Sequence, residues 1–316
     1  MRTLLLALLL CVTSAFAQYP NKPIRMIVPL VPGGNQDIVA RAVAEEVSKN
    51  LGQPVVVENR PGQSAIIGTQ FVKNSQPDGY TLLSVAVTFA RVPAVVKAAG
   101  YNAVTDFTGV SLVCRIPQVL VVHPAFPAKG VQELIAAAKA RPGEVSFGSS
   151  GNGSTGHVAA EMFMRMTGTR LLHVAYKGNA QALVDVMGGQ INMMFDQVST
   201  SGPQVKGGKV RALGVTTISR TAVLPDVPSL HELGLTNFED VTWNGIVAPA
   251  ATPKEILNRL HGAIAKIMSN EEFKKRYLER GIELAASESP EQFSAYIRSQ
   301  AEGFADLVRE AGIKVE

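Results

Sequence analysis

The sequence predicts an α/β protein of two lobes, each with a largely parallel sheet covered by helices. From Ile24 onward, short runs rich in Val, Ile and Leu alternate with amphipathic stretches, the pattern of β–α units. The chain that follows residue 17 exceeds the usual size of a single hydrophobic core. No internal repeat or Gly/Ser linker interrupts it, so we expect ordered strands to connect the lobes.

Nine short segments have the apolar composition of buried strands. They are Ile24–Val28, Val55–Glu58, Tyr80–Val85, Val119–Val122, Val145–Phe147, Leu171–Val174, Ile191–Phe195, Val210–Val215 and Thr242–Ala248. The stretches between them predict helices. In the first, Val39, Val43 and Val47 recur every four residues, while Arg41 and Glu45 occupy the opposite face. This helix should pack by one stripe against a sheet.

Two apolar strands that run into proline-containing turns are the candidate connections between the lobes, Val119–Pro124 and Val241–Pro249. The predicted division places residues 18–121 and 242–316 in lobe 1 and residues 122–241 in lobe 2. The chain from Pro253 to the end has only helical patterns. We therefore expect it to pack back onto lobe 1.

The first seventeen residues have the pattern of a Sec-type export signal. Arg2 precedes an apolar stretch, Leu4–Val12, and the small-x-small site Ala15–Ala17 follows. The apolar stretch is shorter than the roughly 20 residues that span a bilayer. A lipid anchor at Cys11 is disfavoured because Leu10 stands where a small residue is expected. The sequence predicts export with cleavage after Ala17.

Composition disfavours several classes of protein. Only Cys114 remains after processing, so stability must come from the core rather than from an internal disulfide. The formal net charge is +4, and removing Arg2 lowers it by one; without Lys/Arg clusters, nucleic acid is not the expected partner. The histidines lack metal-ligand spacing, so we expect no metal and no cofactor. They are His123, His157, His173, His231 and His261.

Three strand-to-helix loops rich in glycine and small polar residues are the candidate binding segments. They are Pro29–Asp37, Gly148–His157 and Tyr176–Asn179. The N-terminus of a helix presents unpaired N–H groups and the positive end of the helix dipole, which favour anions. Each loop is alternatively an ordinary turn. Lys177 is either a ligand-facing cation or a solvated charge, and Asp196, after an apolar strand, either binds ligand or caps a helix.

Two other functions can be read into the second loop. Gly151–Gly156 matches G-x-G-x-x-G, but the next strand ends without the acidic residue that would hold a ribose. Ser154, His157 and Asp196 could form a hydrolase triad, but Gly148–Gly151 misses the nucleophile-elbow pattern by one residue. A dinucleotide site and a hydrolase are therefore both disfavoured.

Taken together, these segments resemble the Bug, or tripartite tricarboxylate transporter, family of extracytoplasmic receptors. The resemblance runs from Tyr19 to Ile313. The matching segments are Lys22–Arg25, Val28–Pro29, Pro32–Gly34, Leu51–Gly62, Pro77–Leu83, Gly151–His157, Tyr176–Gly178, Phe195–Asp196, Leu224–Pro228 and Ala248–Ala250.

The resemblance implies a type II periplasmic-binding-protein fold, with two α/β lobes, two crossing strands and a ligand cleft between the lobes. It implies a monomeric periplasmic receptor, not an enzyme, that captures a small carboxylate. The carboxylate would pass to the membrane permease subunits of a secondary transporter. A sensor that presents its closed form to a membrane signalling partner is the alternative.

The family pattern also nominates ligand-binding residues. In similar proteins, backbone amides of the first-lobe Pro-Gly-Gly loop hold one carboxylate, and the Gly-Asn-Gly loop holds the rest of the ligand. The corresponding positions here are Gly33, Gly34, Asn35, Asp37, Thr88, Ser149, Asn152, Ser154 and Thr155, with Lys177 and Asp196 beside them.

The chain departs from the family after Leu83. Thr88 still fits a polar contact with ligand. Phe89 and Arg91 indicate either an aromatic or doubly charged ligand, or simply core and surface residues, which is the favoured interpretation. Gln36 stands where Ser or Thr is usual in the family.

Overall fold

The computed structural model describes residues 19–63, 65–151, 153–176 and 178–311. The predicted export signal lies outside these residues.

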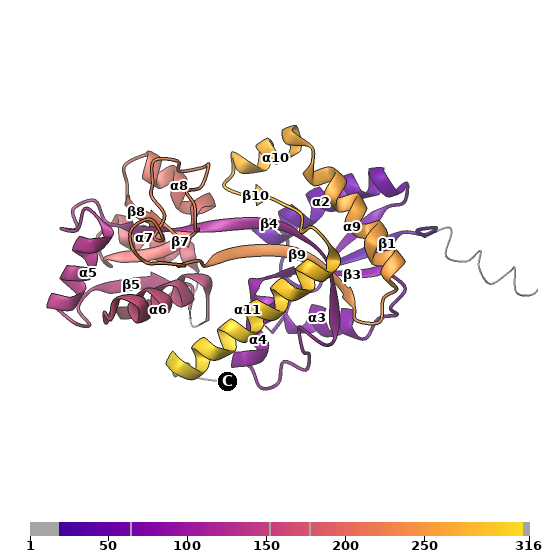
Figure 1. Ribbon diagram of the computed structural model, residues 1–316, viewed down its shortest axis with the longest axis horizontal. Coiled ribbons are helices and arrows are strands. Elements are labelled where there is room, and N and C mark those ends of the chain that lie inside the picture. Colours follow the sequence, from indigo (N-terminus) through magenta and orange to yellow (C-terminus); the bar gives the residue numbers. More distant parts are fainter. Residues whose placement is uncertain (1–18, 64, 152, 177, 312–316) are drawn as a thin grey trace, which may run out of the picture.

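Two α/β lobes lie side by side, and two long strands run from one to the other (Figure 1). Lobe 1 contains β1 (Ile24–Val28), α2 (Asn35–Leu51), β2 (Val55–Asn59), α3 (Ile66–Lys73), β3 (Thr81–Ala86), α4 (Val87–Val95), α9 (Lys254–Met268), α10 (Glu271–Leu278), β10 (Glu283–Leu284) and α11 (Pro290–Ala311). Lobe 2 contains α5 (Val131–Ala140), β5 (Ser146–Ser149), α6 (Thr155–Thr167), β6 (Leu172–Ala175), α7 (Asn179–Met187), β7 (Met193–Gln197), α8 (Val198–Lys206) and β8 (Arg211–Val215). The crossing strands are β4 (Phe107–Val122) and β9 (Val241–Pro249).

Parallel and antiparallel pairing are separated in the sheet. Strands that belong to β–α units pair in parallel: β1 with β2 and β3, and β5 with β6 and β7. Each described pair that includes β4 or β9 is antiparallel. The crossing strands therefore connect the parallel strands of lobe 1 with the parallel strands of lobe 2.

The crossing strand β4 exchanges partners at one point. Pro117 pairs with Val241 of β9, and from Gln118 onward the partners are β7 and β8 of lobe 2. The division predicted at residues 121 and 122 stays a prediction; this exchange lies four residues before it. The expectation that only helices follow Pro253 is wrong, because β10 pairs with β4. Two residues are too few for a periodic pattern.

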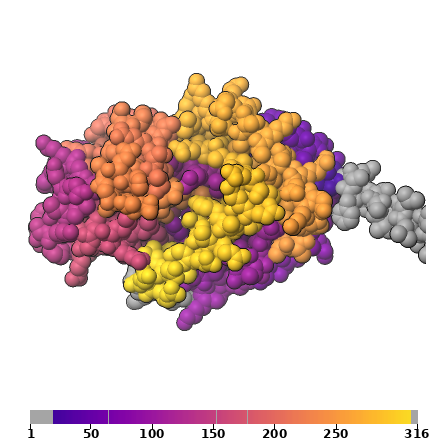
Figure 2. Space-filling view, viewed as in Figure 1, coloured from indigo at the N-terminus to yellow at the C-terminus, as the bar shows by residue number. Residues whose placement is uncertain are grey.

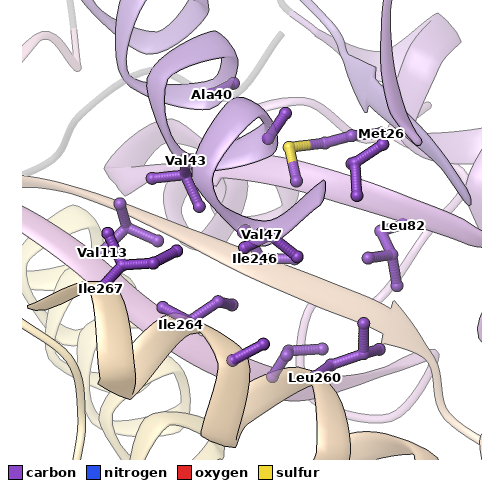
Figure 3. Packing of buried hydrophobic residues seen from close by; sticks show 14 of the residues in the cluster. Met26, Ala40, Val43, Val47, Leu82, Val113, Ile246, Leu260, Ile264 and Ile267 are labelled. Carbon is purple, nitrogen blue, oxygen red and sulfur yellow. The ribbon is translucent and has the colours of Figure 1, made fainter. Parts of the chain in front are cut away.

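The core of lobe 1 lies between the sheet and the helices α2 and α9 (Figure 3). The predicted stripe on α2 is confirmed: Val39, Val43 and Val47 are buried against Ile264 and Ile267 of α9, within one apolar cluster. Burying such a side chain contributes about 1.5–3 kcal/mol relative to leaving it exposed. This packing holds the β1–α2 loop at one edge of the lobe.

The long helix α11 contacts both lobes (Figure 1). Its first half packs on lobe 1 through Phe293 and Ile297. Farther along, Phe304 and Leu307 pack against Val158 of α6 in lobe 2. Among the described residues, no helix combines the length and apolarity needed to cross a membrane.

Candidate functional site

Helices from both lobes begin where strands end, next to one another. The N-termini of α2 and α4 belong to lobe 1, and those of α6, α7 and α8 to lobe 2. Asn35 at the start of α2 donates from Nδ2 to Oε1 of Gln197 at the start of α8, over 2.9 Å. This hydrogen bond places the first glycine loop against the strand-end loops of lobe 2.

The β1–α2 loop presents backbone to solvent. Gly33 has a φ of +87°, which an L side chain rarely adopts, and Gly34 is the N-cap of α2 without a side-chain cap. A Cβ added at either glycine would meet nothing within 4 Å. The first N–H groups of α2 have no side-chain cap, so they are available to an anion or to water.

Asp37 holds the β1–α2 loop in place through hydrogen bonds. Its side chain is almost fully buried and accepts from Gly33 N at 3.0 Å, Arg41 Nε at 3.0 Å and Asn59 Nδ2 at 2.8 Å. The hydrogen bond from Arg41 is the main cause that lowers the pKa of Asp37 to about 2. The carboxylate therefore stays charged and is committed to shaping the loop. Gln36 is likewise turned inward, toward Ser84 O at 2.8 Å.

The β5–α6 loop of lobe 2 is held by hydroxyl groups and histidines. Ser149 is fully buried, and its Oγ lies 2.7 Å from His173 Nε2. Ser154 caps α6 by accepting from the backbone N–H of His157 at 3.4 Å. Thr155 Oγ1 accepts a 3.5 Å hydrogen bond from Thr242 of β9. Asn152 lies outside the described residues.

Asp196 organises the neighbouring helix starts. It is fully buried and accepts from Asn179 Nδ2 at 2.8 Å, Thr200 Oγ1 at 2.5 Å and Ser201 Oγ at 2.6 Å. Burial raises the pKa of Asp196, although these hydrogen bonds oppose the shift. The carboxyl group thus connects the first turns of α7 and α8. Lys177 lies outside the described residues.

The atypical residues of α4 divide into an exposed one and two buried ones. Thr88 is exposed in the first turn. Phe89 is a core residue, stacked on Tyr101 with ring centroids 5.6 Å apart. The sequence suggested a surface position for Arg91, but Arg91 is only 5% exposed. Its Nη2 pairs with Oδ1 of Asp240 at 2.6 Å.

Arg91 also borders a cavity between the lobes. The cavity has a volume of about 290 Å³ and lies among α4, α6, α11 and the segment before β9. Figure 2 shows that the surface is hollowed where the C-terminal helix approaches lobe 2. Asp240 Oδ2 accepts from Gln118 Nε2 at 2.8 Å, so the Arg91–Asp240 pair is tied to the point where β4 changes sheets.

Sequence reasoning missed several residues of this region. Gln197 and Thr242 link α8, α6 and β9, and Asn179 bonds to Asp196. Gln197 follows the last apolar residues of a strand, a signal that could have identified it. Asn179 ends the third candidate loop but was not nominated as a ligand-binding residue. Asp240 carries no such signal, because its partner Arg91 is 149 residues away in the chain.

The geometry does not assemble a hydrolase triad. Ser154 Oγ bonds to the backbone of His157 rather than to its ring, and the ring accepts from Gly153 N at 3.1 Å. Asp196 is occupied by its three donors. Within the described part of the chain, no group of three or more His, Cys, Asp or Glu side chains could hold a metal ion. Each histidine hydrogen-bonds within the fold, as expected of structural histidines.

Comparison with known proteins agrees with this arrangement. The sequence profile of the tripartite tricarboxylate transporter family receptors, TctC, matches residues 39–313. The chain belongs to the TctC family. Protein BugT of Bordetella pertussis is 34% identical over 304 residues, which cover 94% of this chain and 92% of BugT.

Solved structures of similar proteins cover nearly the whole chain. A Rhodopseudomonas palustris protein solved with adipate has a TM-score of 0.79 and 32% identity, covering 94% of this chain and 99% of that one. MatC from the same organism, solved with bound malate, has a TM-score of 0.75 and 28% identity, covering 92% and 100%. The type II periplasmic-binding-protein fold is confirmed, and the protein is a solute-binding receptor of the TctC family rather than an enzyme.

Proposed function

We propose that this TctC-family protein is a periplasmic receptor that captures a small dicarboxylate between its lobes. The observation that carries the proposal is the uncapped glycine start of α2, hydrogen-bonded through Asn35 to the strand-end loops of lobe 2. An anion placed there meets the helix dipole and free backbone N–H groups. The adipate and malate of the two Rhodopseudomonas palustris structures support a dicarboxylate.

Each predicted ligand-binding residue has a place in this proposal. One carboxylate binds the backbone N–H groups of Gly34 and Asn35, while the N–H of Gly33 is held by Asp37 and its φ of +87° shapes the turn. The remainder meets Thr88 from lobe 1 and the α6 start of lobe 2. The lobe 2 residues proposed for contact are Asn152, Ser154, Thr155 and Lys177. Asp37, Ser149 and Asp196 act indirectly, because their side chains are buried in hydrogen bonds that shape the loops.

The proposal includes export and delivery. Residues 1–17 direct the chain to the periplasm and are removed after Ala17. The ligand-bound monomer then passes its carboxylate to the permease subunits of a tripartite transporter. Presentation of the closed form to a signalling partner is the other candidate.

A thermal-shift panel tests the capture of carboxylates. The panel contains di- and tricarboxylates, aromatic acids, acidic amino acids and nicotinate. A ligand present at a hundred times its dissociation constant stabilises the fold by about 2.7 kcal/mol. We expect adipate or another dicarboxylate to raise the unfolding temperature. Equal unfolding temperatures across the whole panel would contradict the proposal.

The matched variants are Gly34→Pro and Gly34→Ala. Gly34→Pro removes one backbone N–H donor from the proposed site and should abolish the shift. Gly34→Ala keeps this N–H, and its added Cβ meets nothing within 4 Å, so this variant should retain the shift. Loss of the shift in both variants would indicate that the site excludes a side chain, rather than that a donor is lost.

A further inference from the structure

Two histidine rings, one from α6 and one from β6, form hydrogen bonds with the β5–α6 loop of lobe 2. The N–H of Gly153 donates to His157 Nδ1 over 3.1 Å. At the other end of the loop, Ser149 Oγ lies 2.7 Å from His173 Nε2. His157 comes from the first turns of α6 and His173 from β6. The shape of the loop therefore depends on two side chains that are not themselves among the proposed ligand contacts.

The two rings also stack on each other. Their centroids are 4.4 Å apart with an interplanar angle of 17°, and Phe147 of β5 stacks on His173 at 4.7 Å. The charged group beside the pair is Glu161 of α6, whose Oε1 lies 3.4 Å from His157 Nε2. The other described neighbours on β5, Phe147 and Ser149, carry no charge. Two positive rings at this separation would repel each other.

The hydrogen bond to Gly153 requires a particular protonation state of His157. A neutral imidazole accepts at one nitrogen and donates at the other. Because Nδ1 accepts from Gly153, the proton of the neutral ring is on Nε2, which faces Glu161. A protonated ring carries N–H groups at both nitrogens and can no longer accept from Gly153.

We infer that His157 and His173 are positioning residues that hold the lobe 2 loop in its ligand-binding shape, so that protonating His157 weakens carboxylate binding. The inference rests on the proposed function. Direct electrostatics predicts the opposite sign, since a positive ring near the loop would attract a carboxylate more strongly. The direction of the pH dependence therefore separates positioning from simple charge attraction.

The first experiment needs no ligand. Imidazole nitrogen NMR of the full mature protein reports the tautomer of His157, and amide exchange reports protection of Gly153. In the neutral form of His157 we expect the Nε2–H tautomer and a protected Gly153 amide. Protonation of His157 should remove that protection. The Nδ1–H tautomer, or protection that survives protonation, would overturn the inference.

The second experiment measures adipate and malate affinity from about pH 7.5 to about pH 5, the range in which imidazoles titrate. In His157→Asn, the side-chain Oδ1 can still accept from Gly153 but cannot be protonated in this range. Protonation of the probe itself affects both proteins equally. Over this pH range, we expect the affinity of wild type to fall about five- to tenfold more than that of His157→Asn. This difference is the size of effect expected from the loss of one hydrogen bond. Parallel profiles, or tighter wild-type binding at low pH, would refute the positioning role.

His231→Asn is the matched control. His231 Nδ1 also accepts a backbone N–H, from Asn237 at 3.0 Å, in a different loop of lobe 2. This variant should keep the wild-type affinity and pH profile, whereas His157→Leu should bind more weakly at every pH. If wild type binds neither probe at any pH, the proposed ligand class fails. The NMR experiment still decides whether His157 holds Gly153.

Discussion

The buried ion pair between Arg91 and Asp240 gives the sharpest prediction for stability. The two side chains are 6% and 4% exposed, and Asp240 also accepts from Gln118. Asp240→Asn keeps the shape but removes the negative charge. The guanidinium then stays buried without a counter-charge, and its Nε and Nη1 already have no hydrogen-bond partner. Breaking such a pair costs about 3–5 kcal/mol.

Thermal unfolding followed by circular dichroism measures this cost. At about 2 °C per kcal/mol for a chain of this size, the midpoint should fall by about 6–10 °C. Adding Arg91→Met to Asp240→Asn removes the unpaired charge and should recover most of the loss. The control is Glu232→Gln, which breaks an exposed pair with Arg220 and should change the stability by at most about 1 kcal/mol. An Asp240→Asn midpoint equal to that of the control would refute the reasoning.

Three further predictions concern pH and the loops. Burial is the main cause and the charge of His157 the second cause that lower the pKa of His173 from 6.5 to about 4. The native state therefore binds fewer protons than the unfolded state, and stability should decrease as pH falls from 6.5 to 4. In pH-dependent unfolding curves, His173→Phe should flatten this decrease. Asp37→Asn should lower adipate affinity about tenfold in calorimetry, because Gly33 N–H loses a charged acceptor, and unchanged affinity would contradict a loop-shaping role. Gly281→Ala should destabilise the fold more than Gly143→Ala. Both glycines have φ near +80°, but a Cβ at 281 would lie 2.6 Å from a backbone atom of lobe 2, whereas a Cβ at 143 meets nothing within 4 Å. Equal unfolding midpoints would count against contact between the lobes at Gly281.

Local patterns predicted most of the fold because most elements have strong local signals. Strand β1 was predicted with its observed bounds, and the buried positions Val39, Val43 and Val47 of α2 were predicted from their spacing, although Ile38, expected beside them, is exposed. The first half of β4 was missed because Thr108, Ser111 and Arg115 interrupt its apolar run. These positions are set by pairing with β9, which lies more than a hundred residues away in the chain.

The candidate site was only partly predictable for the same reason. Glycine loops before helices have a local signature, so Gly33 and Gly34 could be nominated from their spacing and their resemblance to the family. Whether a side chain near the loop faces the ligand or the protein depends on distant partners. Asp37 is turned inward by Asn59, and Arg91 is buried by Asp240. No local pattern contains either contact.

A crystal structure of the mature protein with adipate tests the central claim most directly. We predict one adipate between the lobes, with a carboxylate on the backbone N–H groups of Gly34 and Asn35 and the rest of the molecule against the start of α6. Adipate bound elsewhere, for example at Arg91 in the cavity beside α11, with both glycine loops free of ligand, would contradict the account.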